Sequence, residues 1–187
     1  MLTNISKLAL VLKDQLQFRP HYYLLNDGDF KCKGNAKNPE DACYSLCTNN
    51  GRYYSISHEG ISGNQVVVES LRRMRIDKHY PTHFWAYLDH FAEWCNSKDF
   101  FSNDACLSDT FKHSEIDKDT IASCLEDSGN PEADKTNGLL ELALEVSSNY
   151  GIVQTPTVLM NDDVPMTGQH LKSLTPQNGF GNLVNVI

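Results

Sequence analysis

Cysteines are the residues of this chain with the most obvious chemistry. The 187 residues include six of them, spread over much of the sequence: Cys32, Cys43, Cys47, Cys95, Cys106 and Cys124. An even, widely spaced set suits three structural disulfides and so predicts an oxidising compartment. Six reduced cysteines that pack as small hydrophobic side chains are the alternative. No two have the C-x2-C spacing that zinc sites use, so we expect no metal site among them. We expect no cofactor either.

Redox catalysis would need a particular cysteine pair. A thiol oxidoreductase carries C-x-x-C at the start of a helix, where one thiol has a lowered pKa. Cys32 could hold the first position, but Asn35 stands where the second cysteine would be. Cys43 and Cys47 are four residues apart, and on a helix their Cβ vectors run side by side, which is poor geometry for one disulfide. We therefore prefer structural bridges, with an oxidoreductase or isomerase that uses Cys32 or the Cys43 and Cys47 pair as the alternative.

The pairing of the six cysteines does not follow from the sequence, which allows many connectivities. We expect Cys95 to join Cys106, and Cys43 and Cys47 to reach Cys32 and Cys124. Each long bridge would stabilise the fold by roughly 2 to 4 kcal/mol, because it restricts the unfolded chain.

Thr155, Pro156 and Thr157 place a proline at the threshold of an apolar run. Proline has no N–H for a strand ladder, which favours a cis bond followed by a strand. Thioredoxin-like folds keep such a proline opposite a redox pair, and the residue before it exposes backbone groups that can pair with an extended peptide. These three residues are our candidate peptide-binding loop. A proline kept only for the bend is the alternative.

Seven histidines occur, and three of them, His79, His83 and His90, are candidates for a pH sensor. Exposed histidines without such a role are the preferred interpretation. Pro81 interrupts the helix that would align His79 with His83, so we expect no metal site there.

The spacing of apolar residues predicts mostly helices, with a few strands. Helices are expected over 5–16, around 43–47, and over 63–80, 82–95, 103–112, 117–126, 131–150 and 169–174, and strands over 19–25, 157–160 and 164–168. Trp85 and Trp94 are expected in the core. This order predicts an α/β fold, a thioredoxin-like core with a large disulfide-linked helical insertion over approximately 38–130, in a single domain that spans residues 1–187.

Charge and hydropathy exclude some classes of partner. The formal net charge of −8 argues against nucleic acid, which needs a basic field. No apolar run approaches the roughly 20 residues of a membrane span, so we expect no direct membrane insertion by this segment. A signal-peptide leader is not found at Met1. Together with the cysteines, this predicts an excerpt of a longer, multidomain secretory protein.

Several stretches together resemble a known family. In order they are FRPHYYLL, CYSLCTNNGRYY, VVVESLRRM, FWAYLDHFAEWC, the spacing of the last three cysteines, and TPTVLMNDDVPMTGQHLKSL. From about residue 8 to 174 the chain resembles the luminal central region of plant-type vacuolar sorting receptors. The resemblance implies a preceding protease-associated domain, following growth-factor-like repeats and a membrane anchor, soluble protein cargo, and a secretory-pathway lumen, vacuolar, endosomal or extracellular location. The family pattern has cysteines where this chain has Tyr54 and Arg75, and losing both together is expected if they are disulfide partners.

The sequence therefore predicts a non-catalytic protein-binding or scaffold domain that contributes to recognition of soluble cargo, with cargo or neighbouring domains as partners. A thiol-disulfide oxidoreductase or isomerase is the first alternative. A structural module of an extracellular protein assembly is the second.

Overall fold

The computed structural model describes residues 17–26, 38, 40, 43–152, 157–160, 164–167 and 183–186. The chain divides into two compact units. One unit comprises residues 24–144, and the other takes its described residues from both sides of that range. The expected helices over 5–16 and 169–174 lie outside the described residues.

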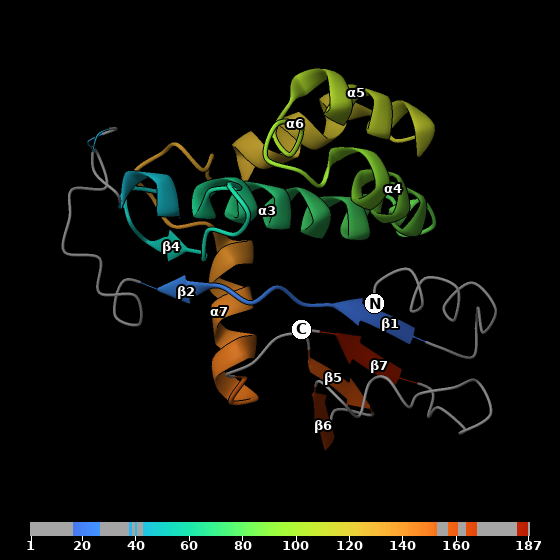
Figure 1. The fold of residues 1–187 in the computed structure, drawn as a ribbon. Coiled ribbons are helices and arrows are strands. Elements are labelled where there is room, and N and C mark those ends of the chain that lie inside the picture. The colour runs from blue at the N-terminus through green and yellow to red at the C-terminus, as the bar shows by residue number, and fades with distance from the viewer. Residues whose placement is uncertain are drawn as a thin grey trace. The chain divides into compact units, whose positions relative to one another are not determined.

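A four-stranded sheet forms the unit built from the two ends of the chain (Figure 1). Its strands are β1 (Gln17–Pro20), β5 (Thr157–Met160), β6 (Val164–Thr167) and β7 (Leu183–Val186), in the order β1-β7-β5-β6. β1 is parallel to β7, whereas β5 is antiparallel to both β7 and β6. The expected strands over 157–160 and 164–168 are present. β7 was not expected from the sequence.

The strand expected over 19–25 is wrong in its extent. β1 ends at Pro20, and a separate short strand, β2 (Leu25–Asn26), begins five residues later. Pro20 therefore closes the first of the two strands. A proline is tolerated at a strand end because it has no N–H to donate to a ladder.

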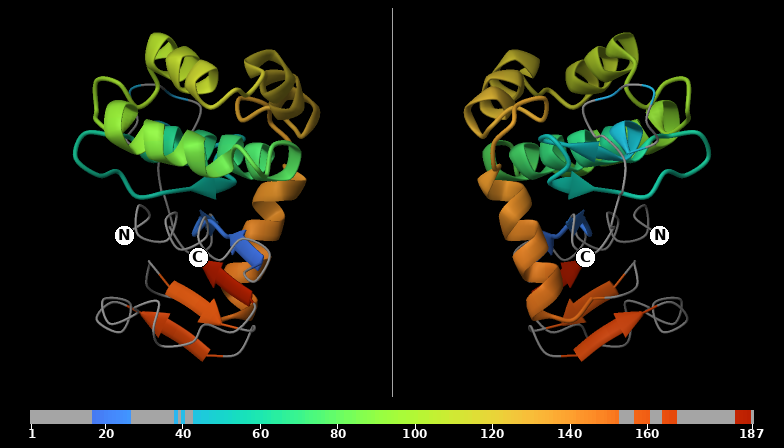
Figure 2. Two further views of the ribbon diagram at one scale, coloured as in Figure 1. Left: turned by 90° about the vertical axis from the view of Figure 1, so that its right-hand side faces the viewer. Right: turned by 90° about the vertical axis from the view of Figure 1, so that its left-hand side faces the viewer.

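Helices dominate the unit of residues 24–144. They are α3 (Gly63–His79), α4 (Phe84–His90), η3 (Phe91–Cys95), α5 (Asp104–His113), α6 (Lys118–Asp127) and the first part of α7 (Gly138–Asn149). α5 and α6 lie on the same side of α3 (Figure 2). Within the described residues, no helix combines the length and apolar character needed to cross a membrane.

Two helix boundaries differ from the sequence prediction. The helix expected over 131–150 begins at Gly138, because the Asn137 side chain accepts hydrogen bonds from the N–H groups of Leu139 and Leu140 and so caps the helix. The helix expected over 82–95 changes after His90 into η3, a π-helical turn. This turn buries Cys95 completely and leaves Trp94 61% exposed, so the expectation that Trp94 lies in the core is wrong.

A small antiparallel sheet accompanies these helices. It contains β2, β3 (Cys47–Thr48) and β4 (Tyr53–Tyr54) in the order β2-β4-β3, and the short 3-10 helix η2 (Tyr44–Leu46) precedes β3. α3 begins against this sheet at Gly63. A Cβ on Gly63 would lie 2.0 Å from the Ser55 carbonyl oxygen and 2.8 Å from that of Leu46. Only glycine therefore permits the helix to start so close to the sheet.

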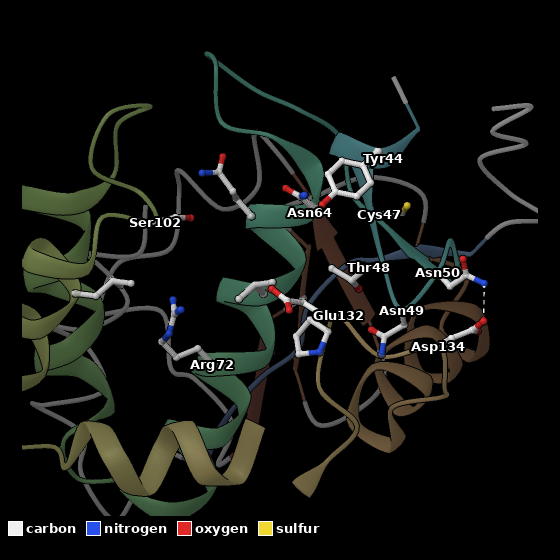
Figure 3. A pocket seen from close by; sticks show the side chains of 14 residues that line it. Tyr44, Cys47, Thr48, Asn49, Asn50, Asn64, Arg72, Ser102, Glu132 and Asp134 are labelled. Carbon is white, nitrogen blue, oxygen red and sulfur yellow. Dashed lines mark hydrogen bonds between the residues drawn. The ribbon is translucent and has the colours of Figure 1, made fainter. Parts of the chain in front are cut away.

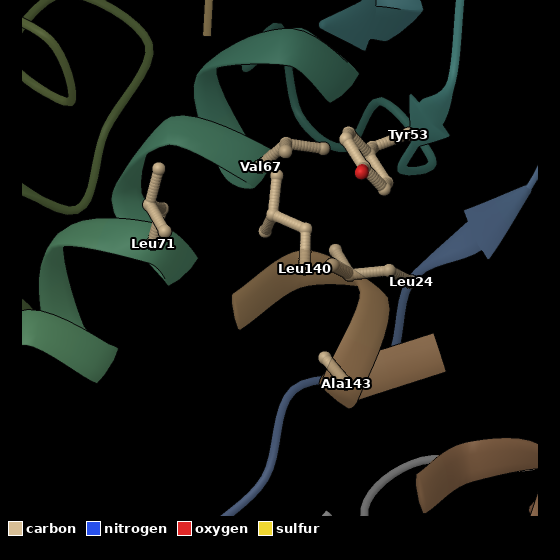
Figure 4. Close-up of a cluster of buried hydrophobic side chains, with 6 residues drawn as sticks. All are labelled: Leu24, Tyr53, Val67, Leu71, Leu140 and Ala143. Carbon is tan, nitrogen blue, oxygen red and sulfur yellow. The ribbon is translucent and has the colours of Figure 1, made fainter. Parts of the chain in front are cut away.

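The core of this unit joins α3, α7 and the small sheet. Its buried side chains are Leu24, Tyr53, Val67, Leu71, Leu140 and Ala143 (Figure 4). Val67 and Leu71 are four residues apart on α3, and Leu140 and Ala143 are three apart on α7, so each pair occupies one helix face. The apolar periodicity that predicted these helices therefore marks the faces that pack together.

A buried charge cluster lies on the next part of α3. Glu69, only 2% exposed, accepts hydrogen bonds from Arg72, from Arg73 Nε at 2.8 Å and from the Tyr87 hydroxyl at 3.2 Å. Burial alone would lower the pKa of Arg72, but Glu69 raises it above its ordinary value. Burial and the charge of Glu69 also raise the pKa of Tyr87. Pairing of this kind is what a buried carboxylate requires.

Candidate functional site

A cavity of about 570 Å³ lies beside β3, within the unit of residues 24–144 (Figure 3). The β3–β4 hairpin, the first half of α3 and the loop after α6 supply most of its walls. The lining residues are Tyr44, Cys47, Thr48, Asn49, Asn50, Asn64, Gln65, Val68, Arg72, Ser102, Leu107, Pro131, Glu132 and Asp134. Four of them carry side-chain amides and three are charged, beside apolar residues such as Val68 and Leu107.

The hairpin turn places two of these amides. Asn49, Asn50 and Gly51 have positive φ values of 51°, 58° and 82°. Asparagine and glycine tolerate this left-handed backbone better than other residues, which is why the sequence turns here. The Thr48 carbonyl accepts from the N–H groups of Gly51 and Arg52 at 3.1 and 3.2 Å and closes the turn.

Asn49 fastens this turn to the loop after α6. Its Nδ2 donates to the carbonyl oxygens of Gly129, Asn130 and Lys135 at 3.0 to 3.1 Å, and its backbone N–H donates to Pro131 O at 2.7 Å. These residues are about 80 positions away in the sequence. One buried side chain therefore shapes two walls of the cavity.

Two buried oxygens, on residues that line the cavity, have no hydrogen-bond partner within the described part of the chain. They are Thr48 Oγ1 and Asn49 Oδ1, on residues that are 7% and 1% exposed. The Nδ2 of Asn49 is already engaged, so the orientation of its amide is settled and its Oδ1 can only accept. An unpaired buried polar group costs about 1 to 3 kcal/mol. A ligand N–H or O–H group could satisfy these oxygens after a local side-chain movement, because less than 1 Å² of each oxygen is exposed.

Charged side chains occupy the rim. Asp134 accepts from Arg52 Nη1 at 2.6 Å and from Asn50 Nδ2 at 2.9 Å, beside Glu132. The Arg72 guanidinium, paired with Glu69, lines another part of the wall. The cavity thus offers carboxylates on its loop wall, amides in its middle and a guanidinium on α3.

The candidate peptide-binding loop is only partly described. Thr157 is the first residue of β5 and is 1% exposed. Thr155 and Pro156 lie outside the described residues, so the cis bond and the binding role of this loop stay predictions.

The cysteines show both agreement and difference. Cys95 and Cys106 form a disulfide with a Cα–Cα distance of 5.9 Å, which joins η3 to α5 as expected. Cys43 is also disulfide-bonded, and Cys32 lies outside the described residues. Cys124 keeps its thiol, so the expected bridge to Cys124 is corrected.

The surroundings of the two thiols explain this difference. Cys124 Sγ lies 3.6 Å from His79 Nε2 on α3. Cys47 is likewise a thiol, so the bridge expected from it is also wrong, and its Sγ donates to the Cys43 carbonyl at 3.0 Å. Tyr54, one of the positions where the resembling family has cysteine, lies opposite Cys47 in the ladder of β3 and β4.

The three histidines considered as a pH sensor have separate partners. His79 faces Cys124, His83 Nδ1 is 2.9 Å from Ser114 O, and His90 Nδ1 is 3.0 Å from Thr110 Oγ1. Among the described residues, no group of three or more histidine, cysteine, aspartate or glutamate side chains is placed to hold a metal ion.

Sequence reasoning missed the residues that build the cavity. Thr48, Asn49 and Arg72 are not among the candidate site residues that the sequence predicts. The TNNG sequence was the only available signal, and it indicates a turn. It does not indicate that the Asn49 side chain is buried in that turn. The partners on the loop after α6 have no local signature.

Comparisons with known proteins agree with this picture. The model of the vacuolar sorting receptor thioredoxin-like domain matches residues 1–173. Vacuolar-sorting receptors 3 and 4 of Arabidopsis thaliana are 29% and 30% identical over 160 residues, which cover 78% of this chain and 24% of each relative. The chain thus spans about a quarter of the length of these relatives, and no solved structure matches it. The chain belongs to the family of vacuolar sorting receptor thioredoxin-like domains.

Proposed function

We propose that this chain is a non-catalytic, protein-binding domain of a receptor-like secretory-pathway protein, and that it contributes to recognition of soluble protein cargo. The observation that carries the proposal is the pair of buried, partnerless oxygens in the cavity beside β3, Thr48 Oγ1 and Asn49 Oδ1. The relatives are named vacuolar-sorting receptors, which supports binding of other proteins and a luminal location.

The chemistry of the cavity suits a polypeptide. A main chain alternates N–H donors with carbonyl acceptors, and both kinds find partners here. Asn49 Oδ1 accepts a donor, Thr48 Oγ1 serves either role, and the amides of Asn64 and Gln65 belong to the same wall. β3 lies at the edge of its sheet, so an extended segment could lie along Cys47 and Thr48.

The cysteine chemistry supports a binding role over catalysis. No C-x-x-C occurs in the sequence. The Cys95–Cys106 bridge spans a separation of 11 residues, and Cys95 is fully buried, which protects it from exchange with a substrate thiol. The bridge therefore holds η3 against α5.

We propose further that the helices between β2 and α7 are an insertion in a thioredoxin-like core. In support, the four strands of the larger sheet come from both ends of the chain, and the compact unit of residues 24–144 separates them in sequence. The loop of Thr155, Pro156 and Thr157 remains a second candidate contact for peptides.

The test compares the peptide affinity of the wild type with that of a variant that lacks only the Thr48 hydroxyl. A short peptide is selected from a random display library on the whole chain, and its affinity is measured for the wild type and for Thr48→Val. We expect binding to weaken about fivefold, from the loss of one hydrogen bond worth about 1 kcal/mol. The stability of the free variant should be equal or higher, because an unpaired buried hydroxyl is removed.

The matched control is Thr120→Val. The Thr120 hydroxyl donates to Asp117, the N-cap of α6, away from the cavity lining. Unchanged affinity with Thr48→Val, in a variant that keeps its fold, would refute the assignment of peptide binding to this cavity. Reduction of insulin above the uncatalysed rate would overturn the non-catalytic part and favour the oxidoreductase.

A further inference from the structure

A second cavity, of about 590 Å³, lies against α4, η3 and α5 and shares no lining residue with the first. Its functional side chains are Asp89, His90, Glu93, Trp94, Asp109 and His113. Three are carboxylates, and the described residues that line it include no lysine or arginine. The wall is therefore acidic when both imidazoles are neutral.

The hydrogen bonds of His90 indicate which ring nitrogen carries the proton in the neutral imidazole. Thr110 Oγ1 donates its proton to Cys106 O at 3.0 Å, so this oxygen accepts from His90 Nδ1, also at 3.0 Å. Neutral His90 therefore carries its proton on Nδ1 and presents a bare lone pair at Nε2. The His90 side chain is 9% exposed, and the centres of the His90 and His113 rings are 4.3 Å apart.

The lone pair at Nε2 faces another acceptor. Asp109 Oδ2 lies 3.6 Å from His90 Nε2, and both groups lack a hydrogen to share when the imidazole is neutral. Asp109 is 72% exposed, so it can turn toward a ligand at little cost. Two acceptors in this arrangement call for a donor that reaches both, preferably a cationic one.

Trp94 adds a surface for a flat cation. Its side chain is 61% exposed, because the π-helical turn rotates it out of the core, and its ring centre lies 6.4 Å from that of His90. An exposed indole next to carboxylates is a favourable place for a guanidinium, which stacks on the ring while its N–H groups bind oxygen.

We propose that this cavity binds an arginine side chain of a partner protein. The guanidinium donates to His90 Nε2 and Asp109 Oδ2 and stacks on Trp94, while Asp89 and Glu93 supply additional negative charge. The planar fork of arginine supplies divergent N–H groups for both acceptors, which a lysine ammonium does with less directional fit.

The test is a titration of the full chain at pH 7.5, followed by amide and indole NMR shifts. The probe is a capped glycine-arginine-glycine peptide, and the same peptide with uncharged citrulline is the ligand control. We expect saturable shifts at His90, Trp94 and Asp109 with the arginine peptide and none with the citrulline peptide. Asp109→Asn should weaken binding about tenfold, as for loss of a charge-assisted hydrogen bond. Trp94→Ala should weaken it to a smaller extent.

Asp99→Asn is the control variant, since Asp99 is an exposed carboxylate that does not line the cavity. It should leave binding unchanged. Equal shifts with the citrulline peptide, or full affinity in Asp109→Asn, would overturn the proposal. Saturation of the same residues by zinc ions without any response to the arginine peptide would also overturn it and assign the cavity to a metal.

Discussion

Replacing Tyr53 by phenylalanine removes a polar contact at the centre of the core. The Tyr53 hydroxyl accepts from the backbone N–H of Asn137 at 2.8 Å and donates to Glu141 Oε1 at 2.6 Å. Both Tyr53 and Asn137 are fully buried. The ring of phenylalanine would fill the same space, so the change isolates the hydroxyl from the apolar packing.

The expected loss of stability is roughly 2 to 3 kcal/mol. A hydrogen bond to a charged group contributes about 1.5 to 3 kcal/mol, and an unpaired buried N–H adds a penalty of its own. The loss should be local as well as global, because Asn137 is the cap of α7. Hydrogen exchange at the Asn137 amide should accelerate in the variant.

The same contact makes the effect depend on pH. Burial, together with the hydrogen bond to Glu141, raises the pKa of Tyr53 to about 12, whereas an unfolded tyrosine titrates near 10. The folded state thus prefers the neutral phenol. Its contribution is fully present below about pH 10 and is lost as pH rises toward 12. The stability difference between wild type and Tyr53→Phe should therefore shrink over this range.

The assay is urea denaturation of both proteins from pH 7 to 11, with Tyr44→Phe as the control. Tyr44 is 42% exposed, and its replacement should change stability by less than about 0.5 kcal/mol. A Tyr53→Phe protein within that same margin of wild type at pH 7 would show that the hydroxyl contributes nothing net. A difference that stays constant above pH 10 would refute the argument about the phenol.

Two further outcomes follow from the structure. Gly63→Ala should destabilise the chain by about 3 kcal/mol in denaturant unfolding, because the added Cβ would lie 2.0 Å from the Ser55 carbonyl oxygen. The control, Gly138→Ala, should be neutral or stabilising, because nothing lies within 4 Å of its added Cβ. Equal effects of the two changes would contradict the close approach of α3 to the sheet. Cys124, which is partly exposed beside His79, should react with maleimide in the native state, whereas the buried Cys47 should react only on unfolding. Peptide mass mapping would identify the labelled cysteine. Labelling in the reverse order would contradict the placement of these thiols.

Local patterns in the sequence predicted the elements with short-range causes. Val67 and Leu71, four residues apart, predicted the buried face of α3, because one side of a helix repeats every three to four residues. Thr157 to Met160 form a strand as the apolar run indicated. Cys95 and Cys106 are close in sequence, and the turn between η3 and α5 brings them together. The expected bridge to Cys124 is wrong, because Cys124 on α6 faces His79 on α3. The packing of one helix against another has no signal in the local sequence.

The sequence by itself determined the helices of the middle region, strands β5 and β6 and the absence of a C-x-x-C pair, since each depends on residues near one another in the chain. Only the tertiary structure decided the two cavities. Asn49 meets Gly129 and Lys135 across 80 and 86 positions, and Asp109 meets His90 across two helices. Contacts of this kind depend on how whole elements pack, and a turn signal or a helical period carries no information about the partner on the other side.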